Sequence, residues 1–339
     1  MTSESHISES NTPQNNSSKS NNRPKDATRR KLMIGAAASG VALAGAAPSV
    51  FAQTGNGKAQ QTEGEFSGKT AFITGGARGI GLACAKEFAI HGANVVIFDV
   101  AEQIDSVMYP LASLSDLDTA KKEIEWLGAN CLAVQGDVRS REAQEKAVKQ
   151  TVDRFGSVDF LVANAGVTHV GQLEAFDEAS TDTVIDINLG GVIKSAQAVL
   201  PVMKKQKSGR IVIMASVTGR MGSAQFPIYS STKWGVIGLA KSIALAAGKE
   251  NITCNAVCPT IVHTKLLDND YVLKNMVPQN PSWDALDGFI KKVFHVLPVG
   301  GYDTSHVAGS VKFLCSEQAA LISGEVIDIG AGANARFNA

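Results

Sequence analysis

The sequence has few cysteines and histidines, and neither type is arranged to bind a metal. The five cysteines are odd in number, widely spread and include no Cys-x-x-Cys pair. This argues against a disulfide framework and against a zinc or dithiol redox site, so we expect five small buried apolar residues. The six histidines show no metal-ligand spacing either. We therefore expect no metal in this protein.

Charge of one sign and long hydrophobic runs are also missing. The chain has 32 Lys and Arg residues against 32 Asp and Glu residues, with no basic cluster in its body. This balance argues against a nucleic-acid partner. The apolar run that ends at Ala47 spans only about 16 residues, whereas a membrane-spanning helix needs about 20. Three glycines interrupt the run: Gly35, Gly40 and Gly45.

The N-terminal segment is predicted to be an export signal rather than part of the fold. Residues 1–26 are rich in Ser, Asn, Thr and Lys and are expected to be disordered. Arg29 and Arg30 precede the weakly apolar run, and the small-residue end at Ala52 is typical of a cleavage site. Residues 1–52 thus resemble a twin-arginine signal, which predicts a periplasmic or exported protein. An uncleaved membrane anchor is the alternative, and residues 53–66 are predicted to be a linker.

From Lys69 onward, strand-like and helix-like segments alternate, which is typical of a parallel sheet covered on both faces. We expect one α/β domain over residues 67–339, a doubly wound Rossmann-type parallel sheet. The predicted strands are 70–74, 93–98, 131–135, 158–163, 210–215, 252–257 and 325–329. The predicted helices are 82–91, 116–127, 141–154, 180–205, 229–247 and 304–315.

A glycine-rich turn joins the first predicted strand to the first predicted helix. Gly75, Gly79 and Gly81 allow a tight turn and let the backbone approach a pyrophosphate, whose charge a helix N-terminus favours. Asp99 ends the next strand, where a carboxylate accepts hydrogen bonds from ribose hydroxyls and repels a 2′-phosphate. Asp99 therefore favours NAD over NADP. Arg78 could pair with such a phosphate and argue the other way, or be a solvated loop residue.

Three side chains further on are suited to proton transfer. Tyr229 and Lys233 lie four residues apart and would share one face of a helix. A free tyrosine titrates near pH ~10, and a neighbouring ammonium lowers that pKa. Ser216 follows a buried strand and could face the pair. A Tyr-x-x-x-Lys pair alone also occurs by chance on exposed helices, so the surrounding motifs carry the argument.

Taken together, these motifs resemble the short-chain dehydrogenase/reductase family, and the resemblance runs from Lys69 to Ala331. It implies a homotetramer and a catalytic tetrad of Asn188, Ser216, Tyr229 and Lys233. The cofactor-binding residues that it implies are Thr74, Gly75, Arg78, Gly79, Ile80, Gly81, Asp99, Asp137, Val138, Asn164, Ala165, Gly166, Tyr229, Lys233, Pro259, Val262 and Thr264. Thr264 falls where a threonine of the family touches the nicotinamide carboxamide. The sequence departs from the family at Thr260, where a glycine usually follows the proline, and this leaves the conformation of that loop open.

Two longer segments, Ala101 to Asp118 and Leu266 to Pro298, resemble the carveol-dehydrogenase-like branch of the family, which includes mycofactocin-associated enzymes. This branch implies oxidation of an apolar secondary alcohol by NAD that can be held too tightly to exchange, and therefore an external electron acceptor. The second segment is expected to be a lid that carries Tyr271, Met276, Trp283, Phe289 and Phe294, which either contact substrate or pack the lid. The expected substrate contacts are Ser216, Met221, Phe226 and Tyr229, and His169 is a further candidate.

The expected mechanism follows from the tetrad. Tyr229 is the general base that takes the hydroxyl proton, and Lys233 lowers its pKa and holds the ribose. Ser216 orients the substrate oxygen, and Asn188 positions a water that leads the proton towards solvent. Two alternatives stay open: a reductase acting on a cyclic or steroid-like ketone, and a non-catalytic NAD-binding protein. The complete tetrad argues against the second.

Overall fold

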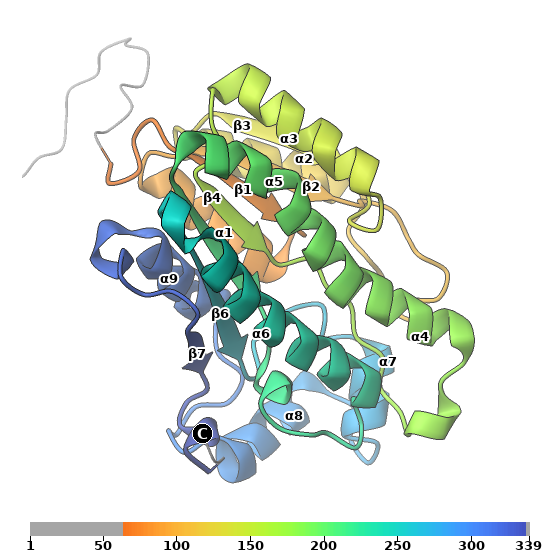
Figure 1. Cartoon of the computed structure of the whole chain (residues 1–339). Coiled ribbons are helices and arrows are strands. Elements are labelled where there is room, and N and C mark those ends of the chain that lie inside the picture. Colours follow the sequence, from red (N-terminus) through yellow and green to blue (C-terminus); the bar gives the residue numbers. More distant parts are fainter. Residues whose placement is uncertain (1–63, 337–339) are drawn as a thin grey trace, which may run out of the picture. The chain divides into compact units, whose positions relative to one another are not determined.

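The computed structural model describes residues 64–336, and the predicted export signal lies outside the described residues. A seven-stranded parallel sheet with the order β3-β2-β1-β4-β5-β6-β7 forms its centre (Figure 1). The strands are β1 (Thr70–Thr74), β2 (Asn94–Asp99), β3 (Cys131–Gln135), β4 (Phe160–Ala163), β5 (Gly209–Met214), β6 (Ile252–Pro259) and β7 (Val326–Ile329). The order reverses between β1 and β4, and ligands of such sheets bind at the carboxyl ends of the strands beside this point.

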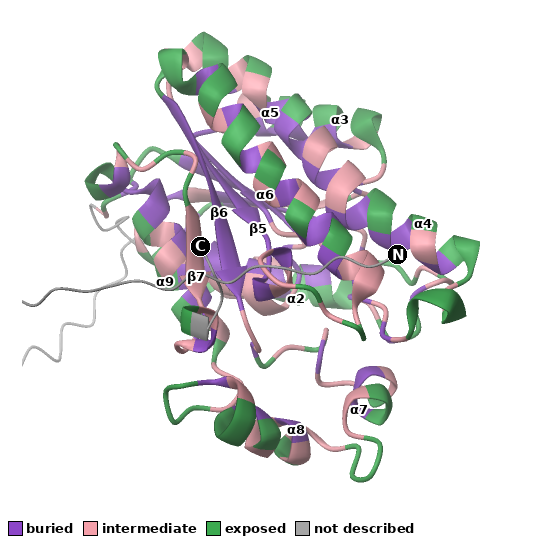
Figure 2. Cartoon of the chain, turned by 60° about the horizontal axis from the view of Figure 1, so that its bottom comes forward, coloured by how far each residue is buried: buried purple, intermediate pink, exposed green. Residues whose placement is uncertain are grey.

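Helices cover both faces of the sheet, as expected for a parallel sheet. The helices are α1 (Gly79–Ile90), α2 (Leu114–Trp126), α3 (Arg141–Phe155), α4 (Glu178–Ile185), α5 (Val192–Gln206), α6 (Pro227–Ala247), α7 (Asp270–Met276), α8 (Trp283–Phe289) and α9 (Thr304–Cys315). Helices α3, α5 and α6 pack on one face, and α1, α2 and α9 on the other. Figure 2 shows the strands buried between these layers, with α7 and α8 beyond the carboxyl ends of the strands.

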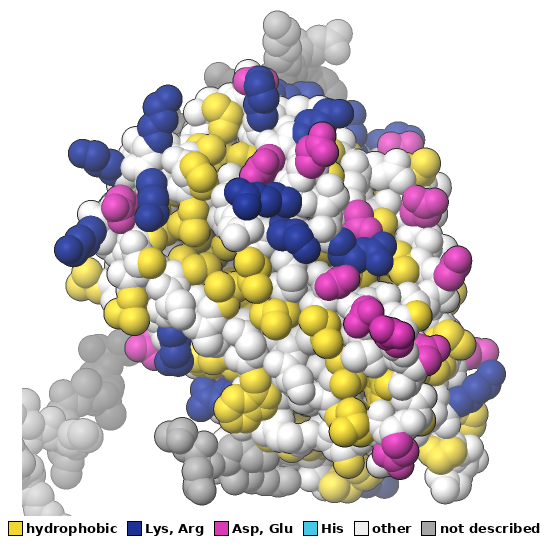
Figure 3. Space-filling model, turned by 45° about the vertical axis from the view of Figure 1, so that its right-hand side comes forward, with side chains coloured by type: hydrophobic (Ala, Val, Ile, Leu, Met, Phe, Trp, Pro, Cys, Tyr) yellow, Lys and Arg dark blue, Asp and Glu magenta, His cyan; other side chains and the backbone are white. Residues whose placement is uncertain are grey.

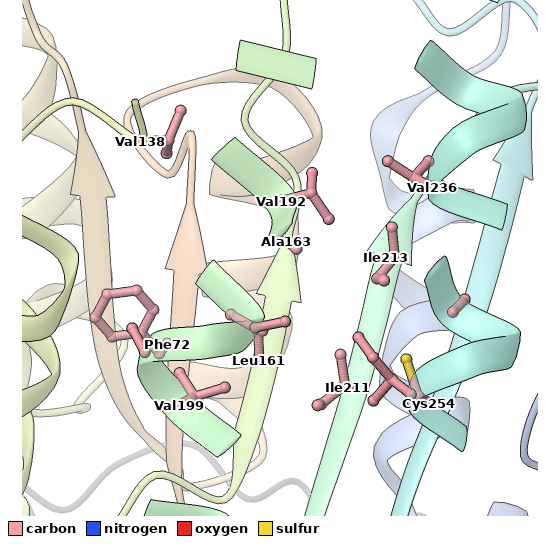
Figure 4. Packing of buried hydrophobic residues seen from close by; sticks show 14 of the residues in the cluster. Phe72, Val138, Leu161, Ala163, Val192, Val199, Ile211, Ile213, Val236 and Cys254 are labelled. Atoms are coloured by element: carbon pink, nitrogen blue, oxygen red, sulfur yellow. The ribbon is translucent and has the colours of Figure 1, made fainter. Parts of the chain in front are cut away.

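The alternation of side chains along each strand creates two hydrophobic cores. Leu161, Ile211 and Ile213 project towards α5 and α6, where Val199 and Val236 lie beside them (Figure 4). Their neighbours Val162, Val212 and Met214 project to the opposite face, towards α1 and α9. Because both faces are covered, the strands are apolar throughout rather than alternately polar. This accounts for the continuous apolar runs that predicted them.

The predicted α/β class and the order of the strands are confirmed, and one of the predicted helices differs in an informative way. A single helix was predicted over residues 180–205, but α4 and α5 are joined by a π-helical turn over Asp186–Gly191. Within it the amide of Asn188 bonds to the backbone of Val167 at 2.8 Å through both its Nδ2 and its Oδ1. These tertiary bonds and the low helix propensity of Gly190 and Gly191 stabilise the wider turn.

The folded domain begins before residue 67, which corrects the end of the predicted linker. The Phe66 side chain is buried and lies 4.9 Å from Phe160 and 5.5 Å from Phe88, measured between ring centroids. An aromatic side chain in this position contributes to the core beneath α1.

The surface of residues 64–336 carries charges of both signs, in agreement with the balanced composition of the chain. Figure 3 shows basic and acidic side chains both spread over one face, with hydrophobic side chains gathered across its middle. Within residues 64–336, no helix is long and apolar enough to cross a membrane, and no group of three or more His, Cys, Asp or Glu could hold a metal ion. All five cysteines are buried and free, as predicted.

Candidate active site

One pocket at the carboxyl ends of β1, β2, β4, β5 and β6 contains most of the predicted site residues. Those that line it are Gly75, Arg78, Gly79, Ile80, Asp99, Asp137, Val138, Asn164, Ala165, Gly166, Ser216, Tyr229, Lys233, Pro259, Val262 and Thr264. The pocket therefore joins the glycine-rich turn and the Ser-Tyr-Lys group in one continuous wall, although more than 130 residues separate them in sequence.

The glycine-rich turn is packed so closely that side chains would not fit. A Cβ atom on Gly81 would lie 2.0 Å from the Gly75 carbonyl oxygen, and one on Gly75 would lie 2.8 Å from Ala165 Cα. Gly75 and Gly79 also have φ angles of +65° and +59°, which glycine adopts without strain. The turn thus presents bare backbone at the N-terminus of α1.

Thr74 and Gly81 do not line the pocket, although both were predicted to contact the cofactor. The Thr74 hydroxyl instead accepts hydrogen bonds from the backbone N–H groups of Asn164 and Ala165, at 3.0 and 3.2 Å. The Asn164 amide donates in return to the carbonyl oxygens of Thr74 and Gly75. These bonds join the ends of β1 and β4, so Thr74 shapes the turn from behind.

Asp99 is buried at the end of β2, and both of its carboxylate oxygens are held by backbone N–H groups. Oδ2 accepts from Ala77 at 3.0 Å and Oδ1 accepts from Ala101 at 3.1 Å. The carboxylate is thereby fixed at the pocket wall with lone pairs still available. The Arg78 guanidinium points to the segment after β2, where it donates to the Pro110 carbonyl oxygen at 2.8 Å.

The segment after β2 adds pocket residues that were not predicted: Ile104, Tyr109, Leu111 and Ala112. The Gln103 amide group holds this segment by donating to three of its carbonyl oxygens and accepting from the Leu111 N–H. The buried Tyr109 hydroxyl accepts from the Thr168 N–H at 2.9 Å and so ties the segment to the loop after β4. Apolar residues in a segment longer than a usual strand–helix connection were the signal that could have found them.

Ser216, Tyr229 and Lys233 meet at the floor of the pocket. Ser216 follows β5, and its hydrogen bond with the Tyr229 hydroxyl lowers the tyrosine pKa. Burial outweighs this bond and raises the pKa of Tyr229 to about 12, while burial lowers the pKa of Lys233 to about 8. Lys233 Nζ donates to the Met214 carbonyl oxygen at 2.7 Å and lies 5.4 Å from the centre of the tyrosine ring.

Asn188 lies beneath the pocket rather than in its wall. Its side chain is fully buried and engaged with the Val167 backbone, and its Nδ2 lies 3.4 Å from the Thr232 hydroxyl. A Cβ atom on Gly166 would lie 3.2 Å from Asn188 Oδ1 and 3.7 Å from Lys233 Nζ. Asn188 and Lys233 thus approach Gly166 from the same side.

The predicted substrate residues divide into two groups. Ser216 and Tyr229 line the pocket, whereas Met221 and Phe226 do not. Phe226 packs in an apolar cluster with Tyr271 and other residues of the segment after β6, with its ring 6.3 Å from that of Tyr229. From that segment, Leu266 and Leu267 do reach the pocket wall.

The segment after β6, for which no helix was predicted, contains α7 and α8 and contacts the body at defined points. The Tyr271 hydroxyl donates to the Val170 carbonyl oxygen at 2.9 Å and accepts from the Val170 N–H at 3.1 Å. His169 lies between the rings of Phe176 and Tyr271, at 4.8 and 5.3 Å, and does not line the pocket. Burial lowers the pKa of His169, which favours the neutral imidazole.

Comparisons with known proteins identify the family of the chain. Residues 69–271 match the family model described as short chain dehydrogenase. The chain is 33% identical over 269 residues to a (-)-trans-carveol dehydrogenase of Rhodococcus erythropolis, which covers 78% of this chain and 97% of that protein.

Solved structures give the same result. A carveol dehydrogenase from Mycobacterium avium in complex with NAD superposes with a TM-score of 0.78 at 33% identity, covering 80% of this chain and 100% of that one. A levodione reductase superposes with a TM-score of 0.72 at 31% identity over the same shares. The chain belongs to the short-chain dehydrogenase family and is similar to its carveol-dehydrogenase-like branch.

Proposed function

We propose that this protein is an NAD-dependent oxidoreductase that transfers a hydride between an apolar secondary alcohol and the nicotinamide. The observation that carries the proposal is that one pocket contains both the glycine-rich turn with Asp99 and the Ser216–Tyr229–Lys233 group. A non-catalytic NAD-binding protein would need only the first of these. The similarity to carveol dehydrogenases supports the same chemistry.

The residues present fit a dinucleotide. The close packing of Gly75 and Gly81 leaves backbone N–H groups at the N-terminus of α1 free to approach a pyrophosphate. The Asp99 carboxylate would accept hydrogen bonds from the adenosine ribose and would repel a 2′-phosphate. Arg78, which could have paired with that phosphate, donates to Pro110 instead. These contacts favour NAD over NADP.

The catalytic steps assigned to the protein are those of a positioned base. NAD, when bound, supplies the hydride acceptor. The Ser216 hydroxyl would hold the substrate oxygen beside Tyr229, and the Tyr229 phenolate would take the hydroxyl proton. Because burial raises the pKa of Tyr229 to about 12, the phenolate needs nearby positive charge to form at neutral pH. Lys233 would provide it as an ammonium that also donates to the ribose.

Asn188 would act through its place beneath Gly166. Its amide fixes the backbone after β4, and its Oδ1 lies on the same side as Lys233 Nζ. A water between the two could lead the proton from Lys233 towards solvent, which is the role that the family resemblance implies. The π-helical turn at this position agrees with that role, because such turns are frequent at functional sites.

An apolar substrate is supported by the walls around Tyr229. Leu266 and Leu267 line the pocket, and behind them Phe226, Tyr271, Met276 and other residues form an apolar cluster. Such walls favour hydrophobic ligands and exclude water. Phe289 is 51% exposed and does not line the pocket.

A ketone reductase is the second candidate. The similarity to a levodione reductase favours it, since the same site can run in either direction. The protonated form of Tyr229 that its raised pKa favours is the form that would donate a proton to a ketone oxygen. The two candidates differ in the direction of hydride transfer and not in the residues.

The setting of the enzyme is part of the proposal. The twin-arginine route carries folded proteins, so export by this route would carry bound NAD out with the enzyme. An external acceptor would then reoxidise the reduced cofactor. An uncleaved membrane anchor is the alternative to an exported protein. A homotetramer is also proposed. Large exposed apolar side chains on α4 and α6 support a partner surface there: Ile185, Trp234 and Leu245.

The test is to denature the purified mature protein and to measure released NAD(H) per chain, then to assay apolar secondary alcohols with added NAD or with artificial acceptors. About one equivalent per chain after dialysis would support a captive cofactor and export in the loaded state. An empty protein that uses added NAD would support an exchangeable dehydrogenase. A protein that neither contains nor binds NAD would contradict the proposed function.

A further inference from the structure

Thr260 stands where the related family has glycine, and its side chain has a defined partner. It follows Pro259 at the end of β6 and lines the pocket beside Val262 and Thr264. Thr260 is not among the residues with positive φ, so the backbone here does not require glycine. Its Oγ1 lies 2.7 Å from Nε2 of His295. Where the family has a glycine without a side chain, this chain therefore has a hydroxyl that forms a hydrogen bond in the pocket wall.

His295 fixes an otherwise exposed stretch to the body of the protein. Within the described stretch 291–299, His295 is the one buried residue, with 4% of its surface exposed. Its Nδ1 lies 3.1 Å from the Val299 carbonyl oxygen, and its backbone N–H donates to Ile290. A buried imidazole with partners at both nitrogens costs little to desolvate, whereas losing one partner would leave a polar atom unsatisfied.

The direction of these hydrogen bonds follows from the partners. A carbonyl oxygen only accepts, so Nδ1 of His295 carries the proton and donates to Val299. In the neutral ring Nε2 is then an acceptor, and the Thr260 hydroxyl donates to it. The Thr260 oxygen keeps its lone pairs for the pocket.

Tyr302 also holds the loop that begins at Thr260, through its hydroxyl and its backbone. Its hydroxyl accepts from the Thr260 N–H at 3.0 Å and donates to the Ile329 carbonyl oxygen at the end of β7. Its own N–H donates to Ile261 at 3.1 Å, and its carbonyl oxygen accepts from the His263 N–H at 2.9 Å. The backbone from Thr260 to His263 is thus held by Tyr302, while the Thr260 side chain is held by His295.

We propose that Thr260 and His295 form a positioning pair that sets the loop 259–264 against the nicotinamide end of the cofactor. The inference rests on the proposed function, because Pro259, Val262 and Thr264 contact that end only if NAD binds as proposed. The pair also ties the far end of the segment after β6 to the pocket wall, next to the Val296 and Leu297 N–H groups that donate to the Ala331 carbonyl oxygen. The other end is held at Tyr271, which is more exposed than the buried His295.

The test compares NAD with ADP-ribose, which lacks the nicotinamide but keeps the groups that face Gly75 and Asp99. In Thr260→Val, an isosteric change that removes the hydroxyl, the Kd for NAD should rise about tenfold, as expected for one unsatisfied buried partner. The Kd for ADP-ribose should stay within about twofold of the unsubstituted value. Thr260→Ser should restore NAD binding. Thr260→Val combined with His295→Phe should cost no more than the larger single change, because the two share one interaction.

Two further measurements separate positioning from a general loss of stability. Thr253→Val is the matched control, since Thr253 is a buried threonine of β6 whose hydroxyl has no hydrogen-bond partner among the described residues. It should leave both Kd values unchanged. Without any ligand, trypsin should cut after Lys291 and Lys292 faster in Thr260→Val than in the control.

The outcomes are distinguishable. Weaker binding of NAD alone, with rescue by serine and faster cleavage, supports the pair. Equal weakening of NAD and ADP-ribose, unchanged NAD binding, or unchanged cleavage in Thr260→Val overturns it. If the unsubstituted protein binds ADP-ribose and NAD equally weakly or not at all, the proposed function itself fails and the inference with it.

Discussion

The segment after β2 (residues 101–118) and the segment after β6 (residues 266–298) both reach the pocket, but they are held in different ways. The first has no helix before Leu114 and is tied down internally by the Gln103 amide and externally by Arg78 and Tyr109. The second contains α7 and α8 and meets the body at separate points along its length: Tyr271 bonds to Val170, the Trp283 ring stacks on His263 at 4.0 Å, and His295 bonds to Thr260.

This difference assigns different mobility to the two sides of the pocket. A segment with a dense set of internal hydrogen bonds opens only when several break together, whereas contacts that lie apart along a segment can open one at a time. The segment after β2 is bonded to Arg78 through Pro110 and to Asp99 through Ala101. The segment after β6 packs on Phe226, whose ring lies 6.3 Å from that of Tyr229. We therefore expect a rigid cofactor side and a movable substrate side, as in enzymes that close over their substrate.

The largest effect on turnover should come from a substitution of Tyr229, which lies at the floor of the pocket between the two segments. Tyr229→Phe removes the proton acceptor but keeps the ring, so turnover should fall ~1,000-fold or more while both sides still bind their ligands. Steady-state kinetics with a measured Kd for NAD would check this. Near-normal turnover in the variant would remove Tyr229 from the mechanism.

A change to the segment after β2 should affect cofactor binding. Gln103→Leu removes the hydrogen bonds to Ile104, Val107, Tyr109 and Leu111, and the Kd for NAD should rise ~10- to 100-fold. The KM for the alcohol at saturating NAD should change little. Calorimetric titration would measure the Kd, with Gln150→Leu on the outside of α3 as the control. A rise in the alcohol KM alone would reverse the assignment of the two sides.

A change to the segment after β6 should have the opposite pattern and a smaller size. Tyr271→Phe removes both bonds to Val170 but keeps the ring against His169. The KM for the alcohol should rise about fivefold, and the Kd for NAD should stay the same. Equal changes in both constants would mean that the two segments move together.

The smallest effect concerns the contribution of Lys233, at the floor of the pocket, to the stability of the protein. Burial lowers the pKa of Lys233 from 10.5 to about 8, so between these values the unfolded chain binds more protons than the folded one. The contribution of Lys233 to stability therefore rises with pH across that window, and a buried ammonium is costly below it. Lys233→Met should raise the melting temperature at pH ~7 by a few degrees, and the gain should vanish by pH ~10. A gain that grows with pH would contradict the lowered pKa.

The sequence predicted the features that depend on local pattern. The apolar strands, the glycine-rich turn and Asp99 could be recognised because each depends on neighbouring residues or on a fixed strand–helix junction. The pocket wall around Ser216, Tyr229 and Lys233 also agrees with the motifs.

What the sequence could not predict depends on contacts between distant residues. The π-helical turn at Asn188 is stabilised by the Val167 backbone 21 residues earlier. Thr260 meets His295 across 35 residues and Tyr109 meets Thr168 across 59, and neither pair has a sequence spacing that marks it. The raised pKa of Tyr229 also depends on its burial, which follows from the fold rather than from the motif.

The most direct test of the central claim is a single-turnover experiment on protein supplied with one equivalent of NAD per chain. An apolar secondary alcohol is added in excess, and the reduced nicotinamide formed per chain is followed by its absorbance. The account predicts about one equivalent of reduced nicotinamide in the unsubstituted protein and essentially none in Tyr229→Phe. No reduction in the unsubstituted protein with any apolar alcohol, or equal reduction in both proteins, would contradict it.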